Sequence, residues 1–426
     1  MTTKYRIFFK NLYIFKYNKL NSNNYQKYIY RRRKMKISVY QELSNIMNKL
    51  SNNMKTGVFL GAGSSMSSGM PGIKALTDSV RKNSIHKEAI DKIISIEKTK
   101  QMNDYSTIED ILNSLRMIRS LTNDMDSLEI FGINGAQSSL IDHDICNDIY
   151  NTLTSKENEI VSNEDLFKAF KRFALWANSV RNSNAIEIFT TNYDLLLEKA
   201  LEDREIPYFD GFIGSYHSFF HQESVENIER ESSLPINWVR LWKLHGSLNW
   251  FWKKNREGDV IYRSNHELKK ESDKEIVIYP SKEKYTLSRK QPFTTYFDRL
   301  KYFLIKSETL FIIQGYSFSD QHINEVIFTS LINNQRLHVM VFVYEDKVLL
   351  DNRDNFVMYK NITVYGPNHV IKSGSLFEWD FDNLSEDKFY DQFVNSDMKN
   401  VTLGDFKIFT DFLIKITTTI GGELDA

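Results

Sequence analysis

Short apolar segments bounded by turn residues recur along this chain and constrain its fold more than any other feature. They are rich in Ile, Val and aromatic residues, as are strands that a sheet buries on both faces. The segments are 57–60, 185–189, 239–244, 275–279, 309–314 and 338–344. Helical patterns follow several of them, as at 195–201 and 320–332. This alternation predicts an α/β fold with a doubly wound, mainly parallel, Rossmann-like sheet.

The remaining regions predict how the chain is organised around this sheet. Residues 77–180 carry Ile, Leu and Met at helical spacing, so we expect a large helical insertion within a domain that spans 35–345. Met35 opens a helical pattern of its own. Residues 346–426 are expected to form an extension that packs on the domain or lies at an oligomer interface. Residues 1–34 are expected to form a disordered basic arm.

Charge is balanced overall but unevenly distributed. The chain has 55 basic and 55 acidic residues, so the whole molecule is not built to bind polyanions. Residues 1–36 nevertheless hold eleven Lys or Arg and no acid, whereas 376–426 hold eleven acids and four Lys. Interleaved aromatics in the arm suit nucleic acid, but basic tails are more often non-specific. Contact with nucleic acid is therefore expected only indirectly or through residues 1–34.

A single cysteine, Cys146, rules out a disulfide within the chain and a Cys-rich zinc site. Low cysteine usage is typical of a reducing compartment. The apolar stretch at 7–15 is short and interrupted, so no membrane span is expected. These features predict a soluble cytoplasmic protein without a structural metal.

A glycine-rich turn follows the first apolar segment. It reads Gly61-Ala62-Gly63-Ser64-Ser65 and continues to Gly69 and Pro71. Glycines between a strand and a helix let the backbone approach a pyrophosphate, whose charge meets amide donors. Met66 stands where the common dinucleotide pattern has its third glycine, so the turn alone does not separate a ligand site from a tight turn.

Three more motifs come directly after predicted strands. They are Thr191-Asn192-Tyr193-Asp194, Leu244-His245-Gly246-Ser247, and Gly315-Tyr316-Ser317 continuing through Asp320 to Asn324. In open α/β sheets, ligand crevices form at the carboxyl ends of the strands. Four motifs at such positions therefore favour one shared ligand site.

With these motifs, the sequence resembles the sirtuin family, and more closely its bacterial sirtuin-like branch associated with antiphage defence. The resemblance spans about 56–345. It implies NAD binding by Gly61, Ala62, Gly63, Ser64, Ser65, Gly69, Thr191, Asn192, Asp194, Gly315 and Ser317. It also implies a catalytic role for His245 in the His-Gly pair. As partners, the resemblance suggests a HerA-type translocase ATPase or a short Argonaute-like protein.

Two departures from the sirtuin deacylases affect the expected activity. Where those enzymes have Asp-Phe-Arg after the glycine loop, this chain has Gly72-Ile73-Lys74. Where they carry a four-cysteine zinc module, 251–274 is charged and free of cysteine. We therefore expect hydrolysis of NAD to nicotinamide and ADP-ribose by a toxic defence effector. Protein deacylation, ADP-ribosyl transfer and non-catalytic nucleotide binding in an assembly remain alternatives.

Three side chains are the candidates for catalysis. Asn192 can hold a ribose hydroxyl and a water, because its amide both donates and accepts. His245 can accept a proton at neutral pH. Asp194 can orient one of these groups or stabilise the positive charge of an oxocarbenium-like state. Without a ligand, Asn192 and Asp194 would be a turn that caps the next helix, and His245 a core histidine bonded to backbone.

His217 and His221 are spaced as if on one helical turn and offer half a metal site at most. His322 and Asn324 either belong to an adenosine site or begin a helix. The charge asymmetry and the aromatic content of 13% favour a homo-oligomer.

Overall fold

The computed structural model of the 426-residue chain describes 35–51, 54–101, 106–123, 125–180, 185–215, 218–229, 235, 238–255, 258–264, 276–278, 291–306, 308–381, 388–395 and 397–421. The expected basic arm at 1–34 lies outside these residues, as does His217. No described helix is both long enough and apolar enough to cross a membrane.

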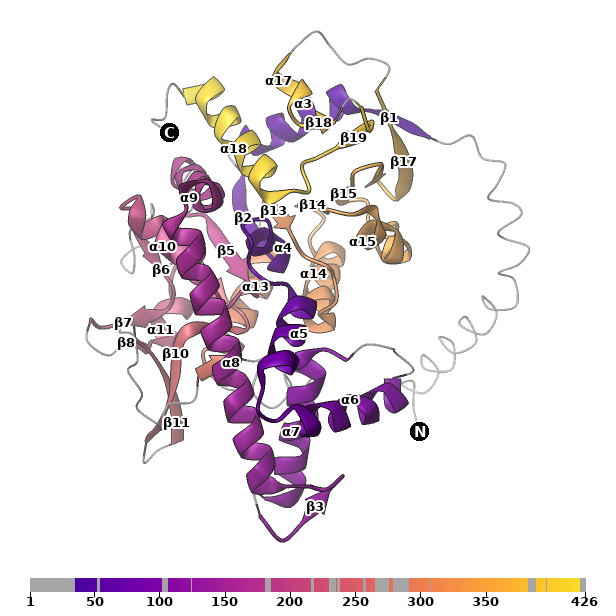
Figure 1. Cartoon of the computed structure of the whole chain (residues 1–426). Coiled ribbons are helices and arrows are strands. Elements are labelled where there is room, and N and C mark those ends of the chain that lie inside the picture. Colours follow the sequence, from indigo (N-terminus) through magenta and orange to yellow (C-terminus); the bar gives the residue numbers. More distant parts are fainter. Residues whose placement is uncertain are drawn as a thin grey trace, which may run out of the picture.

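A ten-stranded sheet forms the centre of the protein (Figure 1). Its strand order is β1-β17-β16-β15-β14-β13-β2-β5-β9-β6, and the pairs between β15 and β6 are all parallel. The predicted mainly parallel α/β sheet is therefore confirmed. The strands are β1 (Lys36–Ser38), β2 (Lys55–Leu60), β5 (Glu187–Thr190), β6 (Tyr208–Phe209), β9 (Val239–Lys243), β13 (Thr309–Gln314), β14 (Leu337–Phe342), β15 (Ile362–Tyr365), β16 (His369–Lys372) and β17 (Ser375–Asp380).

Burial on both faces explains why the central strands are continuously apolar. All six residues of β13 are buried. Leu310 and Ile312 pack into the core on one face, whereas Phe311 and Ile313 pack into the core on the other. Successive side chains of a strand point to opposite faces, so helices must cover both sides of such a sheet.

One face is covered by the amino-terminal helices together with the last helix. The core on this side includes α3 (Val39–Ser51), α5 (Ile73–Asn83), α6 (Lys87–Gln101), α7 (Ile108–Thr122), α8 (Gly135–Ser162), α9 (Glu164–Ser179), α10 (Leu196–Asp203) and α18 (Phe406–Gly421). The short helix α4 (Ala62–Met66) follows β2. The core on the other face of the sheet includes α11 (Gln222–Glu226), α13 (Phe293–Ile305), α14 (Gln321–Asn333), α15 (Asp346–Asp351) and α16 (Arg353–Phe356). Helix α17 (Lys388–Asp391) lies near the carboxyl end.

The predicted helical insertion is present between β2 and β5. Helices α6, α7 and α8 extend away from the sheet at the bottom of Figure 1. The hairpin of β3 (Glu129–Ile130) and β4 (Ile133–Asn134) joins α7 to α8. Helices α7 and α8 each begin with a capping box, at Thr107 and Asn134. In each box, the side chain of the capping residue accepts from a backbone amide three residues later, and the side chain of that later residue accepts from the amide of the capping residue.

A smaller antiparallel sheet corrects one strand prediction. Its order is β12-β10-β11-β8-β7, and its strands are β7 (Phe212–Ile213), β8 (Ser218–Phe220), β10 (Gly246–Asn255), β11 (Gly258–Arg263) and β12 (Ile276–Ile278). The apolar run at 275–279 was expected to be a buried parallel strand, but β12 pairs antiparallel with β10. Three apolar residues do not by themselves distinguish the two pairings.

Two local helix predictions are also wrong. The helix expected from Met35 begins at Val39, because Lys36–Ser38 pair with Glu378–Asp380 of β17. The residues 218–220 form β8, so the helical pattern expected before His221 is not present there, while His217 lies outside the described residues. Long-range strand pairing overrides the local pattern in both places.

The carboxyl-terminal segment continues the main sheet. Strands β15, β16 and β17 follow β14 in the sheet order, and α18 packs on α9. The short strands β18 (Val394–Asn395) and β19 (Asn400–Val401) form a separate pair.

Candidate functional site

Four neighbouring strands end at the same level of the sheet. Gln314 of β13 pairs with Leu60 of β2, Leu60 with Thr190 of β5, and Thr190 with Lys243 of β9. Each of these is the last residue of its strand. The four sequence motifs begin directly after them, so the sheet itself brings the motifs to one edge, where open α/β sheets form ligand crevices.

The glycine turn packs directly against the turn after β13. The amides of Gly61 and Gly63 donate to the carbonyls of Gln314 and Gly315, at 2.9 and 2.8 Å. A Cβ on Gly61 would lie 2.4 Å from the carbonyl oxygen of Gly315, and Gly315 itself has φ +67°. These glycines are therefore required by the close approach of two backbones.

Backbone hydrogen bonds within the protein also engage the amide donors of the glycine turn. The amide of Ser64 also donates within the protein, to the carbonyl of Gly61 at 3.1 Å. Three amides of the glycine turn thus already have acceptors within the protein. Ala62 is exposed at the start of α4, and Gly69 has φ +105° with open space around it.

Asn192 joins the loop after β5 to the glycine turn. Its Nδ2 lies 2.9 Å from the Ser65 hydroxyl, 3.1 Å from the Gly61 carbonyl oxygen and 3.2 Å from the Ser64 hydroxyl. Within the part of the chain that the structure describes, its Oδ1 accepts no hydrogen bond. The amide nitrogen therefore fixes the side chain, and the amide oxygen remains to accept from a ligand.

Asp194 completes this hydrogen-bonded chain. The Ser65 hydroxyl donates to Oδ2 of Asp194 at 2.8 Å, and the amide of Leu196 donates to Oδ1 at 3.3 Å. Burial raises the pKa of the Asp194 carboxyl, and the charge of Lys243 opposes this shift. Asp194 thus accepts from the amide of the first residue of α10, as a turn residue would, and also orients Ser65.

His245 lies at the same edge and is largely enclosed. Its side chain is 12% exposed, and its Nε2 lies 3.0 Å from Oδ2 of Asp320, which comes after β13. Gly246 has φ +102°, a conformation that other residues rarely adopt, so the His-Gly pair sets the course of the chain into β10.

Lys243 and Asp320 are site residues that the sequence interpretation did not assign. Lys243 is buried and its Nζ donates to the carbonyls of Asp194 and Tyr193, at 2.6 and 3.3 Å, and to Glu198 at 2.8 Å. It therefore clamps the loop that carries Asn192. The sequence did contain a signal for Lys243, which is a charged residue at the end of the apolar strand β9. A charge buried at such a position needs polar partners nearby.

The helical insertion is attached to the same loop. Oε2 of Glu157, on α8, accepts from the amide of Leu195 at 2.7 Å, and Glu157 also pairs with Lys199. Burial raises the pKa of Tyr193 well above its usual value, and charges on Glu109 and Arg116 of α7 also act on it. Side chains of α7 and α8 thus lie beside the loop after β5.

The turn after β13 holds the remaining motif residues. Ser317 is exposed, and its hydroxyl lies 3.0 Å from that of Ser319. Nδ2 of Asn324 donates to the carbonyl of Phe318 at 2.8 Å, so Asn324 braces the turn. Thr191 is partly buried beside Asn192.

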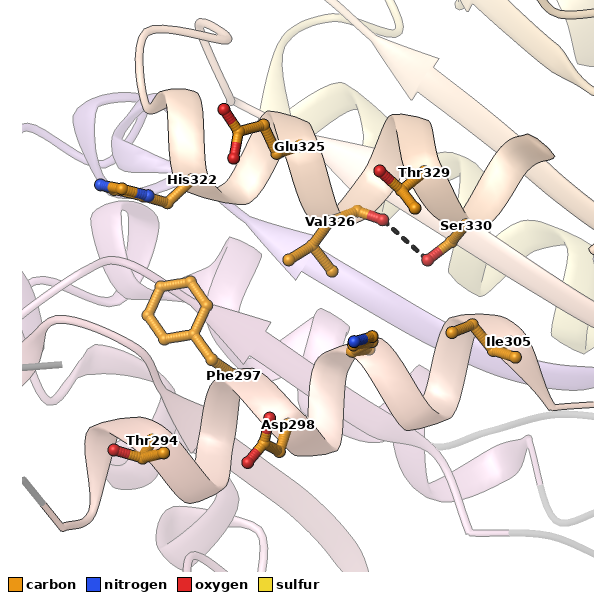
Figure 2. Close-up of a pocket in the computed structure, with 10 residues that line it drawn as sticks. Thr294, Phe297, Asp298, Ile305, His322, Glu325, Val326, Thr329 and Ser330 are labelled. Atoms are coloured by element: carbon orange, nitrogen blue, oxygen red, sulfur yellow. Dashed lines mark hydrogen bonds between the residues drawn. The ribbon is translucent and has the colours of Figure 1, made fainter. Parts of the chain in front are cut away.

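A separate pocket of about 340 Å³ lies between α13 and α14 (Figure 2). It is lined by Thr294, Phe297, Asp298, Lys301, Ile305, His322, Glu325, Val326, Thr329 and Ser330. Of the residues in the four motifs, only His322 contributes to it. The pocket is therefore lined mostly by residues outside the four motifs.

Among the described residues no cluster of three or more His, Cys, Asp or Glu side chains could hold a metal ion. The segment after His245-Gly246 forms β10 and β11, where sirtuin deacylases carry their zinc module.

Comparison with known proteins gives one family match. No curated protein matches the chain. Residues 186–365 match a family described as a SIR2-like domain, a span that includes Asn192, His245 and Asp320 but not the glycine turn at 61–69. SIR2-like domains use NAD, so this match over less than half of the chain supports a sirtuin-like family and an NAD-related enzymatic function.

Proposed function

We propose that this protein hydrolyses NAD at the nicotinamide–ribose bond and releases nicotinamide and ADP-ribose. The observation that carries the proposal is the in-register ending of β13, β2, β5 and β9. Through it, Asn192 and His245 lie at one edge of the sheet together with the glycine turn, and the SIR2-like match covers both residues.

The side chains suit this reaction. Cleavage of an N-glycosidic bond passes through a state with positive charge on the sugar, as in glycoside hydrolysis. Asn192 offers a fixed amide oxygen to a ribose hydroxyl or the attacking water. His245 accepts the proton of that water. Nicotinamide leaves with the electrons of the broken carbon–nitrogen bond, and the water oxygen bonds to the ribose carbon.

Hydrolysis is favoured over deacylation because of the segment that comes after His245. Strands β10 and β11 form an antiparallel hairpin there, and the chain has a single cysteine with which to build a zinc module. The module that supports an acyl-lysine strand in sirtuin deacylases therefore has no counterpart in this sequence.

An assay without any protein substrate tests the proposed reaction. Purified protein incubated with NAD should release nicotinamide and ADP-ribose in equal amounts, measured by chromatography. Loss of the acyl group from an acylated peptide, with no nicotinamide release in its absence, would instead identify a deacylase. Saturable NAD binding without any product would identify a nucleotide-binding subunit.

The proposed cellular role is that of a toxic effector that depletes NAD in bacterial antiphage defence. It is supported by the resemblance to the defence-associated sirtuin-like branch and by the SIR2-like match. A cytoplasmic NAD hydrolase that was always active would kill its own host, so its activity must be controlled. A HerA-type ATPase or a short Argonaute-like protein is the proposed partner.

Control by assembly predicts that the protein is a homo-oligomer whose NAD turnover changes at least severalfold with its state. The basic segment 1–36 and the acidic segment 376–426 offer opposite charges for subunit contacts. Light scattering combined with a turnover assay, on the full chain and on a version that starts at Met35, checks this. A monomer that is fully active alone, and unchanged by the candidate partners, would contradict control by assembly.

A further inference from the structure

Two polar side chains near the loop after β5 have buried atoms that no described protein group satisfies. Both amide atoms of Asn113, Nδ2 and Oδ1, and the hydroxyl of Tyr193 are buried, and none of the three has a hydrogen-bond partner among the described residues. Asn113 lies on α7 of the helical insertion, and Tyr193 lies between Asn192 and Asp194. A buried polar atom without a partner destabilises a fold, so its presence calls for an explanation.

The two side chains belong to the same region of the molecule. Glu109, Asn113 and Arg116 are spaced by four and three residues and therefore share one face of α7. The charges of Glu109 and Arg116 both act on the pKa of the Tyr193 hydroxyl. The Tyr193 side chain also packs against the hydrophobic core cluster to which α7 contributes. This face of α7 thus lies beside the loop that carries Asn192.

The same loop relates these atoms to the proposed catalytic residues. Asn192 directly precedes Tyr193, and its fixed amide offers an oxygen to the ribose or the attacking water. Asp320, whose Oδ2 lies 3.0 Å from Nε2 of His245, is a further charge that acts on the pKa of Tyr193. The unpaired atoms are therefore near the expected position of the nicotinamide–ribose bond, at the nicotinamide end of the substrate.

A neutral group that both donates and accepts hydrogen bonds would satisfy these atoms. An Asn amide has an oxygen acceptor and a nitrogen donor, and a Tyr hydroxyl can act as either. The two charges that flank Asn113 on its face of α7 are of opposite sign, so neither an anion nor a cation is favoured there. In NAD the diphosphate is anionic and the pyridinium ring is cationic, whereas the carboxamide of nicotinamide is neutral and carries one oxygen acceptor and one NH₂ donor.

We propose that the Asn113 amide and the Tyr193 hydroxyl bind the carboxamide of nicotinamide. This inference rests on the proposed use of NAD as substrate. Nδ2 of Asn113 donates to the carboxamide oxygen, Oδ1 of Asn113 accepts from the carboxamide NH₂ group, and the Tyr193 hydroxyl donates a second hydrogen bond to the carboxamide oxygen. The helical insertion thereby completes the site, because it orients the nicotinamide ring relative to Asn192 and His245 before the bond breaks.

Two variants remove the unpaired atoms with little change in side-chain volume. Asn113→Leu replaces both amide atoms by methyl groups of similar shape, and Tyr193→Phe removes only the hydroxyl. Since the removed atoms have no partner among the described residues, the melting temperature of each variant should stay at or above that of the parent. A purely structural role for these side chains would instead lower the melting temperature of both variants.

Calorimetric titration with two probes tests the contact directly. Carba-NAD keeps the nicotinamide but has a carbon in place of the ribose ring oxygen, which makes it resistant to hydrolysis, whereas ADP-ribose lacks the nicotinamide. Asn113→Leu should weaken the binding of carba-NAD about 10-fold or more, and Tyr193→Phe about 5-fold, because carboxamide atoms lose their partners. The binding of ADP-ribose should not change. The matched control is Asn151→Leu, whose exposed side chain lies on α8, and it should bind both probes as the parent does.

An unchanged dissociation constant for carba-NAD in Asn113→Leu overturns the carboxamide site, and so does a parent that does not bind carba-NAD. Equal weakening of carba-NAD and ADP-ribose also overturns it, since the variant would then disturb the whole site. If the parent releases no nicotinamide from NAD but Asn113→Leu weakens carba-NAD alone, the proposed hydrolysis fails and the carboxamide site stands. If the parent hydrolyses NAD and Asn113→Leu does so with the same KM, the hydrolysis stands and the carboxamide site fails.

Discussion

His245→Ala is expected to lower NAD turnover by about 10³-fold or more while leaving the protein folded. General acid–base groups contribute about 10²–10⁴-fold to the rate. The His245 side chain contacts Asp320. Its replacement by a methyl group does not change the backbone that connects β9 to β10, so the variant should still fold. The loss should appear in kcat, measured as nicotinamide released per minute at saturating NAD.

Asn192→Ala should give a loss of about 10²–10³-fold, because it removes the amide oxygen offered to the substrate. It also removes the bonds from Nδ2 to Gly61 and Ser65, so part of the effect should appear in KM. The matched control for both variants is His221→Ala, whose imidazole lies just before α11 and bonds to Ser224 of that helix. If His245→Ala hydrolyses NAD at the parent rate, the proposed mechanism is wrong.

Gly315→Ala should destabilise the fold by about 3 kcal/mol and abolish NAD binding. The new Cβ would lie 2.4 Å from the amide nitrogen of Ser64 and 2.8 Å from the carbonyl carbon of Gly63, and backbone atoms cannot move aside as a flexible side chain can. The positive φ of +67° adds strain. Overpacking and strain of this kind each cost about 1–3 kcal/mol.

Gly69→Ala is the control for the strain alone. Gly69 has φ +105°, but nothing lies within 4 Å of a Cβ added there, so its cost should be about 1–2 kcal/mol. Thermal unfolding compares the two variants, and titration with NAD measures binding by Gly315→Ala. Equal melting temperatures for the two would show that the turns after β2 and β13 do not need their close approach.

The fold, and the meeting of the four motifs at one edge of the sheet, were largely predictable from the sequence. The segment 309–314 corresponds residue for residue to β13, because a strand buried on both faces is apolar throughout. The placement of Asn192 and His245 followed from the rule that parallel strands end at the same edge. The roles of these residues in catalysis stay predictions.

The contacts within the site could not be predicted in the same way. Asp320 and His245 are 75 positions apart in sequence, and their contact depends on how two turns lean across β2 and β5. The sequence also did not show that Gly61 and Gly63 donate to the turn after β13. Loop geometry follows from tertiary packing, which neither spacing nor propensity encodes.

The common ending of the four strands determines where the chain can tolerate changes in length. One extra residue inside β2, β5, β9 or β13 would move the motif after that strand by about 3.3 Å and would turn every later side chain of the strand to the opposite face. A loop remote from this edge, such as the β3–β4 hairpin at the far end of the insertion, can lengthen at little entropic cost. Insertions and deletions among natural variants should therefore accumulate at that hairpin and be excluded from the four strands.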